Sequence, residues 1–375
     1  MEPAKKNLYW IMALIVAASL ALTWHGHACG LLLTHDSHQY LAAAESFRTS
    51  FQFLGIDGTP FTYWPPLFPV VLSLLPSPQV TMAWINVVLV IGLFGMLYVT
   101  ADKLLTNRFF VLSFLFFVFT GVYLQLISVF LWSELIFVAL LTAYLSALSA
   151  KDKKWWLVYM IGFLLCLQRN AGFFIVVGSS FWILLNRAEA WSLRLRKAFS
   201  IFFICSSGLI SWNVYVSFFA GSTFRFYNHD FFGSAWHNFE FLATAMQRTF
   251  LPFSMGAPFL FLLASVVIVY VFRRELVRST TAALLFWILA FYFGGMVIMF
   301  RFDVNDGDRY IAVVIPFAAL LIWMAWERVT QTKDRWKQLA ASSLLLAALF
   351  YPTARSVKNV LLWHQMSCSG VVDNK

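Results

Sequence analysis

Charged side chains in the loops of this 375-residue sequence are the residues whose types and spacing could support catalysis. Asp36 is the first of them, in a His-Asp-Ser-His-Gln-Tyr run that ends at Tyr40. A carboxylate at the start of such a loop could take a proton from an attacking hydroxyl group. Asp36 and Gln39 also have the spacing of a helix capping box, so the spacing alone favours a structural role, although a carboxylate can cap with one oxygen and react with the other.

Two further charges lie next to apolar runs. Glu134 follows Ser133 at the predicted start of a membrane span, where an acid suits the helix dipole. A charge at membrane depth is costly, however, and usually faces a cavity. Arg169 lies at the tip of a predicted hairpin, where it either reaches the lipid headgroups or holds a phosphate. Both residues are candidates for substrate binding.

A late loop, residues 301–310, carries Arg309 and Tyr310 at the start of another predicted span. Its acidic residues lack the alternate spacing of a calcium-binding loop, so we predict no metal site there. Arg309 either pairs with a phosphate or anchors the end of the helix. The titratable residues of the segment 220–256 have no trusted ligand spacing, and we expect most of them to be solvated.

Long apolar runs connect these loops. Hydrophobic residues make up 61% of the chain and charged residues 12%, which excludes a water-soluble fold of this length. A span needs about 20 apolar residues, and the sequence predicts an all-α polytopic membrane protein with about 11 transmembrane helices. The expected spans are residues 8–24, 79–100, 109–127, 130–149, 155–168, 171–186, 199–219, 257–272, 281–299, 310–326 and 338–352.

Some parts of this assignment remain open. The region 155–186 is either two short helices or one kinked span, and 66–75 is too short to cross. A helix after Asp36 places Tyr40, Leu41, Ala44, Phe47 and Phe51 on one face, which predicts an amphipathic interfacial helix in the first outer loop. We expect the first span to be retained rather than cleaved as a signal peptide.

The basic residues set the orientation. With a cytoplasmic N-terminus, 18 of the 27 Lys and Arg residues lie in inner segments, as the positive-inside rule requires. The net charge of +10 is therefore a topology signal, and we predict no nucleic-acid partner. Residues 1–375 form one transmembrane domain, with a first extracytoplasmic loop at 25–78 and a short outer tail at 353–375. The four cysteines have no metal spacing, and we expect packing residues without a disulfide framework.

Four short motifs occur in the order that is typical of the GT-C glycosyltransferases. They are Asp36 followed by Tyr-Leu-Ala, the Trp-Pro-Pro-Leu-x-Pro stretch from Trp64 to Pro69, the pair Ser133-Glu134, and Arg309-Tyr310 before a span that contains Pro316. Over residues 8–320 the chain resembles the bacterial protein O-mannosyltransferase and aminoarabinose transferase group. It departs from the protein O-mannosyltransferases at Ser37, where they carry a glutamate. Many relatives also continue into a soluble outer domain, and whether this protein has one is left open.

The resemblance implies an activity. It implies an inverting glycosyltransferase of the inner (plasma) membrane that uses a polyprenyl-phosphate-linked sugar at the extracytoplasmic face. Asp36 would be the catalytic base, and Arg309 or Arg169 would meet the leaving phosphate. Glu134 would orient hydroxyl groups, and the segment from Trp64 would help to cradle the lipid, with Tyr40 and Tyr310 beside the substrate.

Several alternatives stay open. The acceptor is a lipid, a glycan or a protein, and membrane lipids surround the chain. We predict that no cofactor is required, although a divalent cation is possible. A lipid-linked sugar flippase or transporter is the main rival, but such proteins place polar, broken helices near the midplane. An acyl- or phosphoethanolamine-type transferase would need a nucleophile beside a base or a set of metal ligands, and the sequence offers neither.

Overall fold

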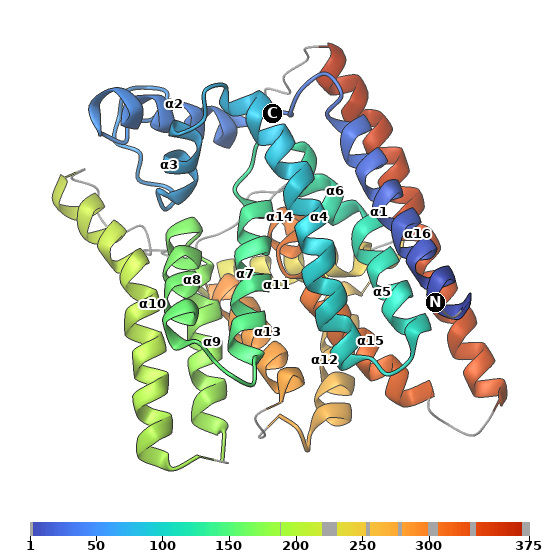
Figure 1. Cartoon of the computed structure of the whole chain (residues 1–375). Helices are drawn as coiled ribbons and strands as arrows, with labels where there is room; N and C mark the ends of the chain where they lie inside the picture. The colour runs from blue at the N-terminus through green and yellow to red at the C-terminus, as the bar shows by residue number, and fades with distance from the viewer. Residues whose placement is uncertain are drawn as a thin grey trace.

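The protein is described by a computed structural model that places residues 3–187, 189–219, 231–252, 256–276, 280–298, 307–330 and 335–369. Within these ranges the chain forms sixteen α-helices and no strand, apart from two isolated bridges. Most of the helices run side by side as a bundle, and α2 and α3 lie at one end of it (Figure 1). The all-α polytopic class predicted from the sequence is confirmed.

Helices occupy each of the eleven predicted span positions. They are α1 (Pro3–Gly26), α4 (Pro78–Leu104), α5 (Arg108–Thr120) with α6 (Val122–Val129), α7 (Glu134–Ser149), α8 (Trp155–Gln168), α9 (Gly172–Leu185), α10 (Trp191–Phe219), α12 (Ala257–Phe272), α13 (Thr281–Ile298), α15 (Ile315–Thr330) and α16 (Arg335–Ser369). By length and apolar composition, four described helices qualify as spans, namely α1, α4, α10 and α13. The pair α5 and α6 makes a fifth if it is one bent span, while α7, α8, α9 and α12 are apolar but shorter. Region 155–186 is two short helices, one of the two predicted alternatives.

The predicted span 109–127 is broken at Gly121, where the helix axis bends by about 40°. Gly121 has an extended backbone and lies against the carbonyl of Phe117, where a Cβ atom would have no room. The amide of the fully buried Gln125 donates a hydrogen bond to the Phe119 carbonyl at 2.8 Å. Because no water reaches this depth, the side chain replaces the helical partner that the carbonyl has lost.

The first long loop contains α2 (His35–Ser50), the predicted amphipathic helix, and α3 (Leu67–Ser73). Tyr40 and Ala44 are buried on the predicted apolar face, whereas Phe51 is 80% exposed. The Tyr40 ring meets the Phe68 ring of α3 edge to face at 4.9 Å. The apolar face of α2 therefore packs on the protein, and α3 supplies part of the surface beneath it.

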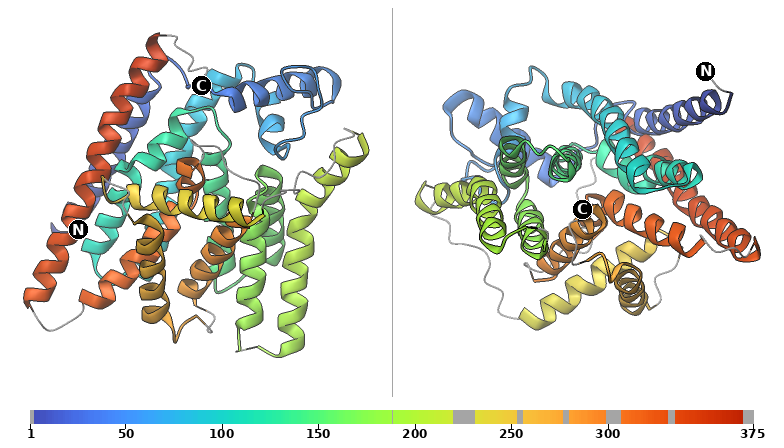
Figure 2. Two further views of the ribbon diagram at one scale, coloured as in Figure 1. Left: turned by 180° about the vertical axis from the view of Figure 1, so that it is seen from behind. Right: turned by 60° about the horizontal axis from the view of Figure 1, so that its bottom comes forward.

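Helix α11 (Phe231–Arg248) falls in the segment from which we expected mostly solvated loop residues. It lies across the span helices and packs on α12 and α13 (Figure 2). Asn238 of this helix is fully buried, and its amide lies 3.3 Å from the Val297 carbonyl at the end of α13. Of the titratable residues that the expectation covered, Glu240 and Arg248 are exposed and His237 is half-buried, so the expectation is wrong only in placing them on a loop. Residues 220–230 and 253–255 of the same segment lie outside the described ranges.

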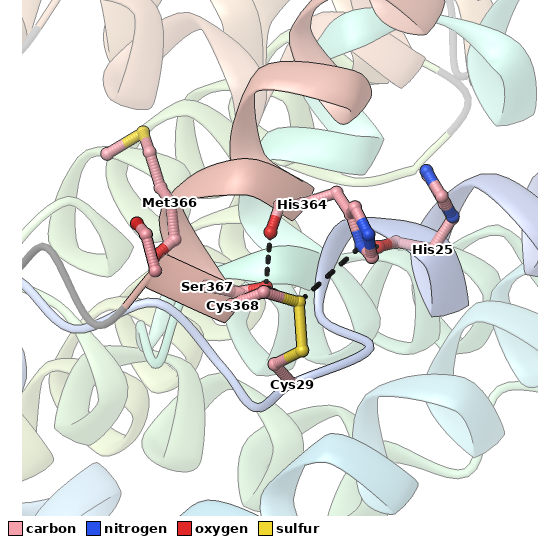
Figure 3. Close-up of a disulfide and its surroundings, with 7 residues drawn as sticks. His25, Cys29, His364, Met366, Ser367 and Cys368 are labelled. Carbon is pink, nitrogen blue, oxygen red and sulfur yellow. Dashed lines mark hydrogen bonds between the residues drawn. A yellow bond between two sulfur atoms is a disulfide. The ribbon is translucent and has the colours of Figure 1, made fainter.

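The C-terminal helix α16 corrects two expectations (Figure 1). Residues 353–369 of the predicted outer tail continue α16 past Pro352 as one helix of 35 residues beside α1. Cys368 on its last turn forms a disulfide with Cys29, just beyond α1 (Figure 3). The expectation of no disulfide was wrong because 339 residues separate the two cysteines and only the pairing of α1 with α16 brings them together. Cys166 and Cys205 are buried free thiols, as expected of packing residues.

Candidate active site

A short extended pairing aligns the first loop with the start of α7. The Leu32 N–H donates to the Val129 carbonyl at 3.1 Å, and the Leu131 N–H donates to the Leu32 carbonyl at 2.9 Å. The two paired segments continue from here into α2 and α7. Asp36 and Glu134 therefore come to the same end of the bundle, although they are far apart in the sequence.

Arg309 joins these two carboxylates. It lies on the short helix α14 (Gly307–Ala312), and its Nη1 donates to Asp36 Oδ2 at 2.6 Å. Its Nε and Nη2 donate to Glu134 Oε1 at 2.9 and 2.8 Å. One guanidinium thus binds carboxylates from α2 and α7 at once, using the forked donor geometry of arginine.

Arg169 adds a second cation at the end of α8. Its Nη1 lies 2.6 Å from Glu134 Oε1 and donates to Ser133 Oγ at 3.0 Å. The neighbouring Gln168 amide donates to the Ser133 carbonyl at 2.9 Å. We call Asp36, Glu134, Arg169 and Arg309 the charge cluster; its formal charges sum to zero.

The charge cluster is shielded from solvent. The exposed fractions of the four side chains are 0% for Glu134, 9% for Arg169, 13% for Arg309 and 19% for Asp36. Burying an unpaired charge is expensive, so each of these groups depends on its partners. Asp36 is the carboxylate nearer to solvent, and Glu134 lies behind it.

Aromatic rings border the two arginines. The Arg309 guanidinium carbon lies 4.2 Å from the centre of the Trp132 ring, and that of Arg169 lies 6.0 Å from the centre of the Tyr310 ring. The Tyr40 hydroxyl lies 3.4 Å from Ser133 Oγ. Burial raises the pKa of Tyr40 well above its ordinary value, so this hydroxyl stays protonated. The aromatic faces favour the cations and limit how far they move.

The capping role expected for Asp36 belongs to other residues. Thr34 is the N-cap of α2, and its N–H donates to Ser37 Oγ at 3.0 Å. Ser37 in turn donates to the Leu131 carbonyl at 3.0 Å and is fully buried. Asp36 lies in the first turn and its carboxylate turns toward Arg309. Ser37, where the chain departs from the protein O-mannosyltransferase pattern, therefore has a structural task.

Six of the seven residues predicted for the site gather in or beside the charge cluster. The exception is Trp64, which lies one layer further out, with its ring 5.3 Å from the Tyr40 ring and 5.8 Å from the Phe61 ring. Trp132 and Gln168 were not predicted as site residues. In the sequence, what pointed to them was that Trp132 directly precedes Ser133 and Gln168 directly precedes Arg169.

In the described ranges, no group of three His, Cys, Asp or Glu side chains is placed to hold a metal ion. The carboxylates of the charge cluster are bound by guanidinium groups instead. Residues 301–306, which carry two of the acidic residues of the late loop, lie outside the described ranges. The prediction that no cofactor is required remains a prediction.

This protein resembles known proteins in its fold but has no significant match in sequence. No family model matches the sequence, and no curated protein matches it significantly. The structure, however, superimposes on crystal structures of ArnT from Cupriavidus metallidurans. The complex with undecaprenyl phosphate gives a TM-score of 0.57 at 14% identity, covering 96% of this chain and 77% of ArnT. The apo form gives 0.58 at 12% identity, covering 96% and 78%.

The chain has the fold of ArnT. This likeness extends over nearly the whole chain, so the sequence resemblance is confirmed at the level of fold, and the chain is a multi-pass membrane protein. At this identity the likeness assigns no residue a role. The roles of the charge cluster must therefore be argued from its own geometry.

Proposed function

We propose that the protein transfers a sugar from a polyprenyl phosphate to an acceptor hydroxyl, with Asp36 as the general base. The observation that carries the proposal is the bridge of Arg309 between Asp36 and Glu134, in a chain with the GT-C fold. One of the similar ArnT structures contains undecaprenyl phosphate, which supports a lipid carrier of this chemical class.

The reaction requires one base and at least one cation. The acceptor oxygen attacks the anomeric carbon, the bond from that carbon to the phosphate oxygen breaks, and the configuration inverts. The acceptor proton passes to Asp36, and the lipid phosphate leaves with the bonding electron pair. Arg309 and Arg169 would balance the charge that gathers on the departing phosphate.

The ion pair between Arg309 and Asp36 suggests an order of binding. The Arg309 guanidinium occupies Asp36 Oδ2, so this oxygen is not free to accept a proton from an acceptor hydroxyl while the pair is intact. A donor phosphate competes with Asp36 for Arg309, and its binding would release Asp36 to accept the proton. We therefore propose that the donor binds before the acceptor is deprotonated.

Glu134 would act through the arginines. Its Oε1 already contacts both guanidinium groups, and its side chain has no exposed surface. We propose that it holds Arg169 and Arg309 in place while Arg309 exchanges Asp36 for phosphate. This role replaces the direct contact with substrate hydroxyls expected from the resemblance.

The charge cluster would work on the extracytoplasmic side of the inner membrane. Helix α2 and the disulfide-linked ends of α1 and α16 lie at the same end of the bundle (Figure 1). Disulfides persist in oxidising compartments, and the positive-inside rule places this end outside by an independent argument. The acceptor class, whether lipid, glycan or protein, is left to experiment.

The test is sugar transfer from a panel of polyprenyl-phosphate sugars by purified protein in matched lipid. Asp36→Asn should slow transfer at least about a hundredfold, as expected for the loss of a general base. It should also bind polyprenyl phosphate up to about fivefold more tightly, because the competing charge is gone. Glu45→Gln, which changes a 62% exposed carboxylate on the same helix, is the matched control and should resemble the wild type.

Equal transfer by the wild type and Asp36→Asn would exclude Asp36 as the base. If the wild type transfers none of the sugars but moves a labelled lipid-linked sugar across vesicles, the protein is a flippase and the proposal is wrong.

A further inference from the structure

Helix α14 also takes part in a second polar cluster, which is separate from the charge cluster. Asp308, directly before Arg309, accepts a hydrogen bond from Arg355 Nη2 of α16 at 3.2 Å through Oδ2. Its Oδ1 lies 3.1 Å from the Tyr123 hydroxyl of α6. Two adjacent residues of one short helix therefore have different partners. Arg309 belongs to the charge cluster, whereas Asp308 binds Tyr123 of α6 and Arg355 of α16.

Arg355 connects four helices at this point. Its Nη1 donates to the Arg248 carbonyl at the end of α11 at 2.9 Å, and its guanidinium lies 5.7 Å from the centre of the Tyr123 ring. The Tyr123 hydroxyl also lies 2.7 Å from the Ala245 carbonyl of α11. Helices α6, α11, α14 and α16 thus meet at the Asp308 carboxylate, the Arg355 guanidinium and the Tyr123 hydroxyl.

Two further contacts of α14 are a backbone hydrogen bond and a packing contact. The Tyr292 hydroxyl of α13 donates to the Tyr310 carbonyl at 2.8 Å. Gly307 lies against the Phe241 ring, with no room for a Cβ atom. A helix of six residues has little stability of its own, so these contacts determine where its backbone lies.

We propose that Asp308 and Arg355 are positioning residues that hold α14 so that Arg309 meets the donor phosphate. The inference rests on the proposed function, in which Arg309 exchanges Asp36 for phosphate. Arg309 can make that exchange with its side chain only if its backbone stays fixed. The pair of Asp308 with Arg355 would hold that backbone through contacts that do not involve the charge cluster.

We expect substitutions of Asp308 or Arg355 to weaken binding of the sugar donor and to leave binding of the acceptor unchanged. Asp308→Asn keeps the size of the side chain but weakens the pair with Arg355. Misplacement of a catalytic group by about 1 Å costs on the order of a hundredfold in rate. We expect Asp308→Asn and Arg355→Gln each to raise the donor KM and the Kd for polyprenyl phosphate about tenfold or more, with the acceptor KM unchanged.

The experiment measures the Kd for polyprenyl phosphate, the KM values for donor and acceptor, and thermal unfolding for each variant. Asp308→Glu retains the charge and should recover most of the donor affinity. The double variant Asp308→Asn with Arg355→Gln should be no worse than the poorer single variant, because both break the same contact. Glu275→Gln, which breaks the partly exposed pair of Glu275 with Arg328, is the control and should leave all the kinetic values unchanged.

Wild-type donor affinity in Asp308→Asn, or equal changes in donor and acceptor KM, would overturn the proposal. Failure of the proposed function gives a different result, because the wild type itself would then transfer no sugar. In that case the Kd for polyprenyl phosphate still tests the positioning role. A tenfold higher Kd in Asp308→Asn supports that role, and a lack of polyprenyl-phosphate binding by the wild type and all variants contradicts it.

Discussion

Two buried glutamates at opposite ends of the bundle bind very different partners. Glu327 of α15 is 5% exposed and accepts hydrogen bonds from the Thr106 N–H, the Thr106 hydroxyl and the Asn107 N–H, at 3.0, 2.9 and 2.6 Å. These donors belong to the chain that leads into α5. Glu134 instead binds the guanidinium groups of Arg169 and Arg309, one of which also holds Asp36.

The difference separates a structural carboxylate from one suited to function. Backbone N–H groups can move only with the chain itself, so Glu327 holds α15 against the start of α5. Guanidinium groups on flexible side chains can exchange one anion for another. The end of the bundle that contains Glu134 can therefore respond to a phosphate, whereas the contacts of Glu327 hold helices together.

The sharpest test of this contrast is Arg309→Lys. Lysine keeps the charge but loses the fork that reaches two carboxylates, so we expect transfer to fall by about a hundredfold or more. Sugar-transfer kinetics in matched lipid measure the effect, with Arg328→Lys at the other end of the bundle as the control. Near-normal transfer by Arg309→Lys would mean that a point charge suffices and that the bridge is incidental.

The second test compares the glutamates directly. Glu134→Gln leaves two buried arginines facing a neutral side chain, and we expect unfolding to become easier by about 3–5 kcal/mol, with transfer largely lost. Glu327→Gln keeps a hydrogen-bond acceptor at the helix start, so a loss of about 1–3 kcal/mol is expected.

Thermal unfolding and transfer assays on both variants decide the comparison. Transfer per folded molecule should stay near the wild-type value only in Glu327→Gln. Equal losses of transfer in the two variants would show that both carboxylates are merely structural.

A third prediction concerns which end of the bundle faces outward. Cys29→Ser or Cys368→Ser should lower the free energy of unfolding by about 2–4 kcal/mol and leave the other cysteine as a free thiol. A membrane-impermeant thiol reagent should label that cysteine in intact cells but not in the wild type. Labelling only after the cells are opened would reverse the orientation and place the charge cluster inside.

The smallest expected effect is that of metal removal. Because arginines bind the carboxylates of the charge cluster, a chelator should leave the transfer rate unchanged within error. Activity assays with and without chelator, followed by addition of Mg²⁺ or Mn²⁺, test this. Loss of activity on chelation with recovery on adding either ion would show that a cation, rather than Arg309, meets the phosphate.

The sequence predicted the helical elements well where the signal is local. Apolar runs identified eleven span positions, and a helix occupies each of them, because the hydrophobic pattern depends only on neighbouring residues. Such local patterns could not show that α11 caps α13, or that 353–369 is helical. Both depend on packing partners that lie far away along the chain.

The charge cluster likewise has features that the sequence predicted and features that only the structure revealed. Composition and spacing determined that Asp36, Glu134, Arg169 and Arg309 were unusual, because charges beside apolar spans are rare and expensive. Only the tertiary structure decided that Arg309 lies between Asp36 and Glu134, which are 273 and 175 residues away from it. It also assigned the capping box to Thr34 and Ser37 instead of Asp36 and Gln39, and revealed the disulfide between Cys29 and Cys368. The physical reason is that a single residue type sets the cost of burying a charge, whereas helix packing sets which partner relieves that cost.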